Sequence, residues 1–429
     1  MRVKSLLGKK NRLLGKLDKT TWVEMAIFLV LAVCFLFFIK PRVNSAVEPL
    51  RMSWLPSDRV SLACMVFFSV GVIVAFGLRR RIDVFCLCVT ALCGLILVST
   101  VYNEGDVLVV VTDWLPCLAT VMVVALNIEK RPRSLVGAFF VACMFYLLVN
   151  LYCLLRSPYL IGFDSLSDLF FGYRNVTFRV AVPAFACSLA LDAFEEKRWS
   201  VRTVTVYALC VFELAVAYSA TAMCAFVLVG VLWAALCFDR RGRLLNAATY
   251  MGGYCALFLG FVVMRVQNML GFIIEPVLQR SVTFTGRTEI WDGAFQHIFA
   301  GSHFLTGYGT GYIGSLLNAL GATQKHAHND LLHAFLLGGA GAALSLVAMV
   351  ALAVRNLYRG RASRLAASLS IGLAGFLLVS IAEVSMCAGL CFILAFSFYC
   401  NFSGEDGVPK HQKNARAPKH EPKSLKAAR

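Results

Sequence analysis

Five of the seven histidines in this 429-residue chain lie between residues 297 and 333. Three of them fall in "QKHAHNDLLHAFLLGG", residues 324–339, where a polar segment runs directly into an apolar one. Four side chains of this stretch are of types able to bind metals or transfer protons: His326, His328, His333 and Asp330. Their types fit a metal site, proton-transfer chemistry, or the polar boundary of a membrane helix.

A zinc site requires three or four ligands that converge on one point. His326 and His328 alternate as they would in an extended segment, whereas His326 and His333 would share one face of a helix. No H-E-x-x-H motif is present, and no cysteine lies in this region. We therefore expect no metal here and no cofactor.

Two other interpretations of the stretch remain. Asn329 and Asp330 are ordinary N-cap residues, so the polar side chains can simply begin the helix that the apolar residues from 331 onward predict. Alternatively, one imidazole acts as a general base, because an unperturbed pKa of about 6.5 suits proton transfer near neutral pH.

A cation suited to phosphate lies upstream, in "TFTGRTEIWDGAFQHIFA", residues 283–300. Its apolar positions, 290, 294, 295, 298 and 299, predict a helix that lies on the membrane surface or on a helical bundle. Arg287 falls in the first turn, and its planar fork fits diphosphate oxygens. A base and a permanent cation together favour chemistry on a charged, lipid-borne substrate.

A glycine-rich segment, "FLTGYGTGYIG", separates the two motifs. Its Gly309, Gly311 and Gly314 spell G-x-G-x-x-G, but no strand–turn–helix context for a dinucleotide site surrounds them. We expect a turn that lets the backbone approach another surface, with Tyr308 and Gly309 as supporting residues whose amides can face a phosphate or sugar oxygen.

The rest of the chain has to hold these residues in a membrane. It is 59% hydrophobic and 15% charged, which predicts an all-α polytopic membrane protein rather than a water-soluble domain. Twelve apolar runs are long enough to suggest transmembrane helices. They are 22–39, 59–78, 83–101, 107–128, 134–155, 178–194, 202–219, 221–238, 246–266, 331–354, 365–383 and 385–401.

Basic residues cluster in alternate loops, and such loops are retained in the cytoplasm. This pattern places both termini in the cytoplasm and the longest loop outside, and topogenic charge accounts for most of the net charge of +17. We expect no nucleic-acid partner, and we expect contact with membrane lipids. The predicted parts are a basic tail (1–21), spans one to nine (22–266), a catalytic outer loop (267–330), spans ten to twelve (331–401) and a basic tail (402–429).

Three motifs in this order, "TGRTEIW", "FLTGYGTGY" and "HAHNDLLHAFLLGGAG", resemble the O-antigen ligases and O-antigen polymerases, which share one membrane module. The resemblance covers about residues 281–345. It implies a metal-independent, inverting glycosyltransferase with about twelve transmembrane helices in the bacterial cytoplasmic (inner) membrane, acting in lipopolysaccharide or other cell-envelope polysaccharide assembly. The implied donor is a glycan on undecaprenyl diphosphate, and the implied acceptor is a lipid core, a wall component, a protein or a second lipid-linked repeat.

By the same resemblance, His328 is the catalytic base and Arg287 binds the diphosphate, with His326, Asn329, Asp330 and His333 in support. The chain departs from the family where members carry Ser-Arg, because "YSATA" (218–222) has no arginine. Arg174 and Arg179 are the candidates for a second diphosphate-binding arginine, and interfacial anchoring is the alternative for both.

Two further functions stay open. An O-antigen or capsule polymerase would join lipid-linked repeats instead of transferring a glycan to another acceptor. A transporter or lipid-linked glycan flippase would use ionisable groups inside the membrane, for which Asp113 and Glu213 are the candidates. The concentration of polar residues in an outer loop favours an enzyme over a transporter.

Overall fold

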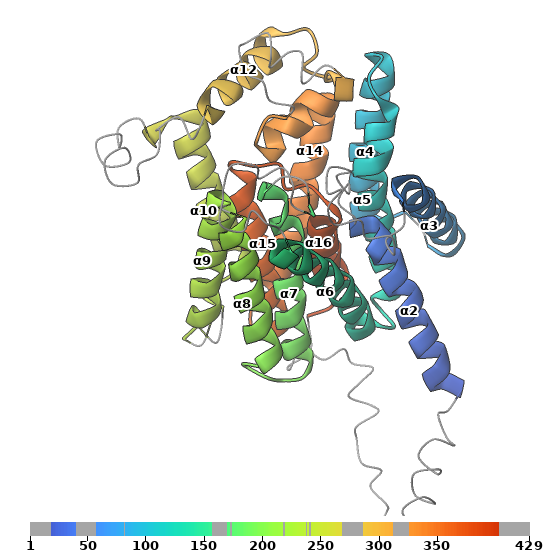
Figure 1. The fold of residues 1–429 in the computed structure, drawn as a ribbon. Coiled ribbons are helices and arrows are strands. Elements are labelled where there is room, and N and C mark those ends of the chain that lie inside the picture. Colours follow the sequence, from blue (N-terminus) through green and yellow to red (C-terminus); the bar gives the residue numbers. More distant parts are fainter. Residues whose placement is uncertain are drawn as a thin grey trace, which may run out of the picture.

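The protein is all-helical in every part that the computed structural model describes (Figure 1). The described residues are 19–39, 57–80, 82–156, 170–171, 174–217, 219–236, 238–239, 242–267, 286–311 and 326–402. The first seven helical elements are α2 (Lys19–Ile39), α3 (Asp58–Arg79), α4 (Val84–Tyr102), α5 (Val107–Asn127), α6 (Pro132–Arg156), η2 (Arg174–Val176) and α7 (Phe178–Phe194). The others are α8 (Val201–Val216), α9 (Ala220–Ala235), α10 (Ala247–Leu257), η3 (Phe258–Val263), α12 (Arg287–Ala300), α14 (Asp330–Arg359), α15 (Arg364–Ser380) and α16 (Ala388–Tyr399).

Each of the twelve predicted apolar runs contains a helix, so the predicted all-α class is confirmed. Within the described ranges, six helices are long and apolar enough to cross a membrane: α2 to α6, and α14. Shorter apolar helices lie at Ala220–Ala235, Ala247–Val263, Arg364–Ser380 and Ala388–Tyr399. The number of spans and their direction across the membrane remain predictions.

Polar contacts show which loops lie at each end of the bundle. At one end the basic loops meet, since Arg131 pairs with Glu24 at 2.7 Å and Arg133 pairs with Glu195 at 3.1 Å. At the other end, Asn103 after α4 donates to the carbonyl of Gly307 at 3.2 Å. α12 belongs to this second end and lies at the top of Figure 1. Among the described residues, these basic loops and the segment around Gly307, which were predicted on opposite sides of the membrane, therefore lie at opposite ends of the bundle.

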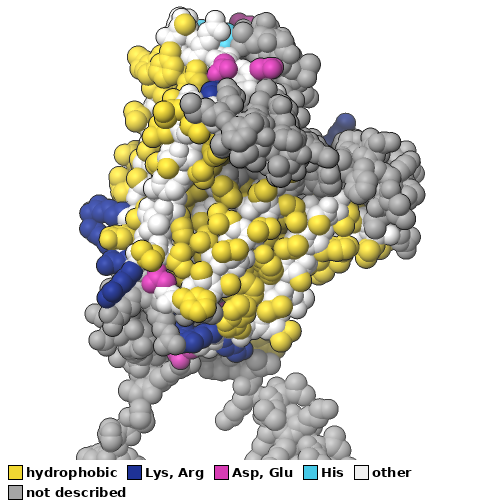
Figure 2. Space-filling view, turned by 90° about the vertical axis from the view of Figure 1, so that its left-hand side faces the viewer, with side chains coloured by type: hydrophobic (Ala, Val, Ile, Leu, Met, Phe, Trp, Pro, Cys, Tyr) yellow, Lys and Arg dark blue, Asp and Glu magenta, His cyan; other side chains and the backbone are white. Residues whose placement is uncertain are grey.

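Side chains on the surface follow the same division. Figure 2 shows hydrophobic side chains across the middle of the face on which α9 and α10 lie, and Lys and Arg mainly in its lower half. One membrane acid departs from the sequence interpretation: Asp113 is exposed on α5, within 3.1 Å of the Thr112 hydroxyl, and is not interior. Glu213 is fully buried and accepts a hydrogen bond from Asn150 at 2.7 Å.

The glycine-rich segment is built into a break in α14. In an uninterrupted helix the amide of Ala340 would donate to the carbonyl of Leu336. Here Ala340 donates to Phe304 at 2.8 Å, and Leu336 accepts from Tyr308 at 2.6 Å. The break falls at Gly338 and Gly339. Two hydrogen bonds to the segment 304–308 replace the helical hydrogen bond from Ala340 to Leu336.

Glycine is required on both sides of this junction. Gly339 has φ 71° and ψ −168°, a region open essentially to glycine alone. Gly307 has φ 71°, and a Cβ there would lie 2.5 Å from the Gly339 nitrogen. The turn thus brings two backbones together, as the sequence predicted, and it holds the first two turns of α14 at an angle to the rest of that helix.

Candidate active site

Glu383, in the loop between α15 and α16, joins side chains from four parts of the chain. Its Oε1 accepts hydrogen bonds from Arg287 at the start of α12 and from Asn175 in η2. Its Oε2 lies 3.1 Å from Nδ1 of His328, which precedes α14. Ser219, between α8 and α9, donates to the Asn175 oxygen at 2.8 Å and fixes the orientation of that amide.

The backbone before α14 turns the His328 side chain towards Glu383. His328 has φ 48°, in the left-handed region that non-glycine residues seldom adopt. The next residue, Asn329, is the N-cap and accepts from the amides of Leu331 and Leu332 at 3.1 and 3.2 Å. The predicted cap is therefore present, and the strained residue beside it is the one predicted to act as base.

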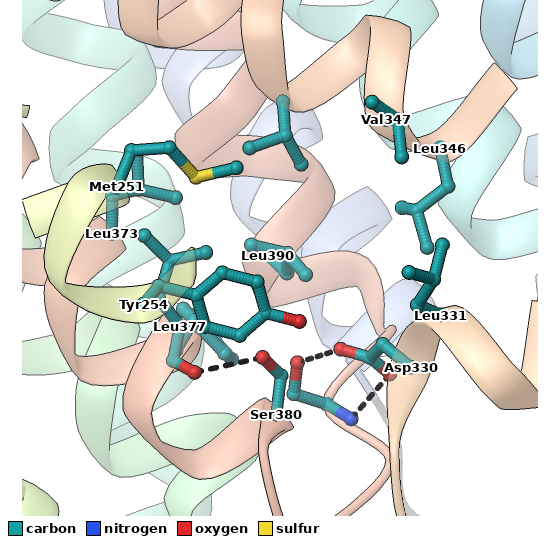
Figure 3. A pocket seen from close by; sticks show the side chains of 13 residues that line it. Met251, Tyr254, Asp330, Leu331, Leu346, Val347, Leu373, Leu377, Ser380 and Leu390 are labelled. Atoms are coloured by element: carbon teal, nitrogen blue, oxygen red, sulfur yellow. Dashed lines mark hydrogen bonds between the residues drawn. The ribbon is translucent and has the colours of Figure 1, made fainter. Parts of the chain in front are cut away.

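Asn329 and Asp330 also attach α14 to the loop that carries Glu383. The Asn329 amide donates to the carbonyl of Ser380 at 3.1 Å. The buried Asp330 carboxylate accepts from the amides of Ser385 at 2.8 Å and Met386 at 3.1 Å, and from the Ser385 hydroxyl. Figure 3 shows Asp330 close to Ser380, with two of the Asp330 hydrogen bonds as dashed lines. Both residues therefore hold His328 and Glu383 in register.

Arg287 is the first residue of α12, after Gly286 with φ 83°. α12 is held against the bundle by buried side chains that include Ile290 and Trp291. Arg265 supports the same turn, since it donates to the Thr288 carbonyl at 3.1 Å and its guanidinium lies 5.1 Å from the centre of the Trp291 ring. The sequence predicted a helix here with Arg287 in its first turn and left the membrane surface and the bundle open as its location. In the structure the helix packs on the bundle.

Arg179 is the second arginine near this cluster. Its Nη2 donates to the carbonyl of Val384 at 2.8 Å, next to Glu383, and its buried Nε has no hydrogen-bond partner among the described residues. Arg174 begins η2, but its side chain lies outside the part of the chain that the structure describes. Arg179, one of the two candidates for the second diphosphate-binding arginine, therefore lies next to the cluster.

His326 and His333 complete a row of three imidazoles. The ring centres of His326 and His328 are 4.1 Å apart, and those of His326 and His333 are 6.4 Å apart. Burial, the neighbouring His328 and the nearby arginines lower the pKa of His326 to about 4. No group of three His, Cys, Asp or Glu residues in the described ranges is arranged to hold a metal ion.

Tyr308 and Gly309 lie in a structural junction. The Tyr308 hydroxyl donates to the His297 carbonyl at 3.2 Å, and its amide bonds to α14. Gly309 packs against the backbone of Thr100 in α4, where a Cβ would come within 2.6 Å. No hydrogen bond described for either residue reaches Glu383.

The arrangement can accept a proton beside a fixed positive charge. Burial raises the pKa of the Glu383 carboxyl, but the hydrogen bond from His328 and the charge of Arg287 outweigh it, so the pKa lies below its ordinary value. An ionised Glu383 accepts the Nδ1 hydrogen of His328, and the neutral tautomer then carries its lone pair on Nε2. Such a histidine can take a proton while Arg287 and Arg179 face an anion.

Sequence reasoning missed three members of the cluster: Glu383, Asn175 and Ser219. Glu383 is the last residue of the predicted apolar run 365–383, and an ionisable residue at the end of a predicted span is by default a functional candidate. This signal was available. Asn175 gave no comparable signal, because only the folded chain brings it to Glu383.

Helices in every apolar run and a buried ionisable cluster at one end of the bundle define an all-helical polytopic membrane protein. Residues 205–340 of this chain match the O-antigen ligase family. The predicted resemblance is thereby confirmed, and the matched segment includes Arg287 and His328 but ends before Glu383. No curated protein and no solved structure that was compared shows significant similarity to the chain.

Proposed function

We propose that the protein is an O-antigen ligase-like membrane enzyme that transfers a glycan from undecaprenyl diphosphate to an acceptor hydroxyl. The observation that carries the proposal is the cluster itself, because one buried carboxylate, Glu383, bonds both the predicted base His328 and the predicted phosphate ligand Arg287. The match to the O-antigen ligase family supports the same reaction class.

In the proposed step, the acceptor oxygen attacks the anomeric carbon of the donor sugar and inverts it. His328 takes the hydroxyl proton on Nε2 as the new carbon–oxygen bond forms. The bond from the sugar to the diphosphate breaks, and the negative charge that develops on the departing phosphate is stabilised by Arg287 and Arg179. Glu383 stabilises the resulting imidazolium, so each residue acts where charge changes during the step.

An apolar pocket beside the cluster supports a lipid-linked donor. It is lined mainly by apolar side chains of α10, α14, α15 and α16. Figure 3 shows Asp330, Ser380 and the Tyr254 hydroxyl together at one end. Because Asp330 lies two residues after His328, we propose that a part of the hydrocarbon chain close to the diphosphate lies in this pocket, while the diphosphate itself binds Arg287.

The proposed site lies at the end of the bundle opposite the basic loops. With the basic loops in the cytoplasm, transfer takes place on the outer side of the bacterial cytoplasmic membrane, where lipid-linked glycans await assembly. A polymerase would use the same base and the same diphosphate site. Only the acceptor distinguishes the two reactions, and the family match is to the ligase description.

The cellular test is His328→Ala in a strain that depends on this protein. We expect surface glycan to be lost and carrier-linked glycan to accumulate, at an unchanged protein level. His303→Ala is the matched control, since His303 lies in the same outer segment and its described side-chain contacts are with the Thr306 hydroxyl, at 3.4 Å, and the Tyr308 ring, not with Glu383. Normal surface glycan in the His328→Ala strain would overturn the proposal.

A further inference from the structure

We propose that Glu383 is a counter-ion shared between Arg287 and His328, and that a bound diphosphate draws Arg287 away so that His328 becomes a stronger base only when the donor is present. The inference rests on the proposed function and deepens it. It gives the site a means of coupling donor binding to activation of the base.

The sharing follows from how the two carboxylate oxygens are used. Oε1 faces Arg287, and Oε2 faces His328 at 3.1 Å. The Arg287 side chain is 15% exposed and that of Glu383 only 5%, so little solvent screens their interaction. While Arg287 neutralises the carboxylate, Glu383 favours a proton on His328 less than an unpaired carboxylate would.

A diphosphate competes for Arg287 with better geometry and more charge. Its oxygens accept two parallel hydrogen bonds from the guanidinium fork, whereas Arg287 makes its described contact with Glu383 through Nη2 alone. When Arg287 turns to the phosphate, Asn175 still donates to Oε1 and is itself held by Ser219. Glu383 therefore stays in place and keeps its full negative charge for His328.

The other charged and titratable groups around His328 do not replace the effect of the Glu383 charge on this imidazole. His326 and His333 are the neighbouring imidazoles, and the low pKa of His326, about 4, keeps that ring neutral at physiological pH. Arg179 bonds the Val384 carbonyl, and Asp330 is fully engaged by Ser385 and Met386. Glu383 is thus the carboxylate that bonds His328 in the described structure, and Arg287 is the arginine that bonds Glu383.

The first test measures binding of inorganic diphosphate to the full-length protein by calorimetry. Glu383→Gln keeps the shape of the side chain but removes the charge that competes for Arg287. We expect this variant to bind diphosphate about tenfold more tightly than the wild type, the effect of about one charge-assisted hydrogen bond, while turnover falls at least about a hundredfold. A residue with a merely structural role would weaken binding and turnover together.

Glu289→Gln is the control, because Glu289 is an exposed acid in the same first turn of α12. Its removal should change diphosphate affinity less than about twofold. Equal or weaker binding by Glu383→Gln would overturn the counter-ion proposal alone. If neither the wild type nor Glu383→Gln binds diphosphate, the proposed donor site is wrong, and the proposed function with it.

A second test compares two pH profiles of the wild-type protein. The acid limb of kcat/KM reports the base in the free enzyme, and that of kcat reports it with the donor bound. We expect the midpoint for kcat to lie about one pH unit above that for kcat/KM, because His328 regains the full charge of Glu383. Coincident midpoints in the wild type would contradict the inference. If Glu383→Gln folds, most of the separation should disappear in it.

Discussion

At the scale of single residues, the site depends on how firmly Glu383 is held. The hydrogen bonds described for Asn175 and Ser219 reach Glu383 and not His328 or Arg287, and together they keep one carboxylate oxygen in place. Asn175 is therefore a positioning residue. It is also the residue that would secure Glu383 when Arg287 binds phosphate.

We expect Asn175→Ala to lower kcat about tenfold, the effect of one buried hydrogen bond to a charged group, with the KM for the donor changed less than about twofold. The control is Asn356→Ala at the opposite end of the bundle, where the Asn356 amide bonds the carbonyls of Ser397, Phe398 and Cys400. This control should lose stability but keep its kcat. Steady-state kinetics of the two variants, with a thermal unfolding curve for each, decide the matter. Equal kcat losses in both would show that Asn175 has only a structural role.

At the scale of elements, the break in α14 sets the direction of the segment that carries the base. The first turns of α14 follow His328, and the segment from 304 to 308 fixes their angle by exchanging hydrogen bonds at Leu336 and Ala340. The break depends on a backbone conformation at Gly339 that a side chain does not tolerate.

Gly339→Ala should therefore cost about 2 kcal/mol or more of folding free energy and reduce transfer activity, because the added Cβ meets the Leu305 carbonyl. Gly94→Ala in the neighbouring α4 is the matched change, since nothing lies within 4 Å of a Cβ built there. The second variant should be as stable as the wild type or gain up to about 1 kcal/mol. Thermal unfolding in detergent compares the two, and equal stability would argue against a rigid break.

Element positions were largely predictable, and the tertiary partners of the site were not. Apolar runs are local signals, and each of them contains a helix in the structure. The residue type of Asn329 likewise predicted the N-cap of α14. The contact of His328 with Glu383 spans 55 residues of sequence, and only packing of α14 against α15 and α16 creates it. Sequence also could not choose between Arg174 and Arg179.

At the scale of the whole molecule, pH should affect stability through the buried imidazoles. The unfolded chain protonates His326 near its ordinary pKa of 6.5, whereas the folded chain resists protonation until about pH 4. Between these values the unfolded state binds more protons, so stability falls as the pH falls.

His326 alone should contribute a loss of about 2 kcal/mol between roughly pH 7 and pH 5. His326→Gln, which does not titrate, should flatten this part of the curve. Unfolding temperatures of both proteins, measured at several pH values in one detergent, check the prediction. A slope that is the same with and without His326 would show that other groups cause the acid sensitivity.

The two ends of the bundle differ in their chemistry. Basic loops gather at one end, and the cluster around Glu383 lies at the other with the apolar pocket beside it. A lipid-linked donor fits this division, because its hydrocarbon chain, its diphosphate and its sugar each meet a different environment.

The most direct measurement of the central claim is glycan transfer by the purified protein. The wild type and His328→Ala are incubated with undecaprenyl diphosphate-linked glycan and a set of candidate acceptors, and mass spectrometry identifies which acceptor gains the glycan. We predict that the wild type transfers the glycan and that His328→Ala, folded and still able to bind the donor, is at least about a hundredfold slower. Transfer by His328→Ala at the wild-type rate would contradict the account.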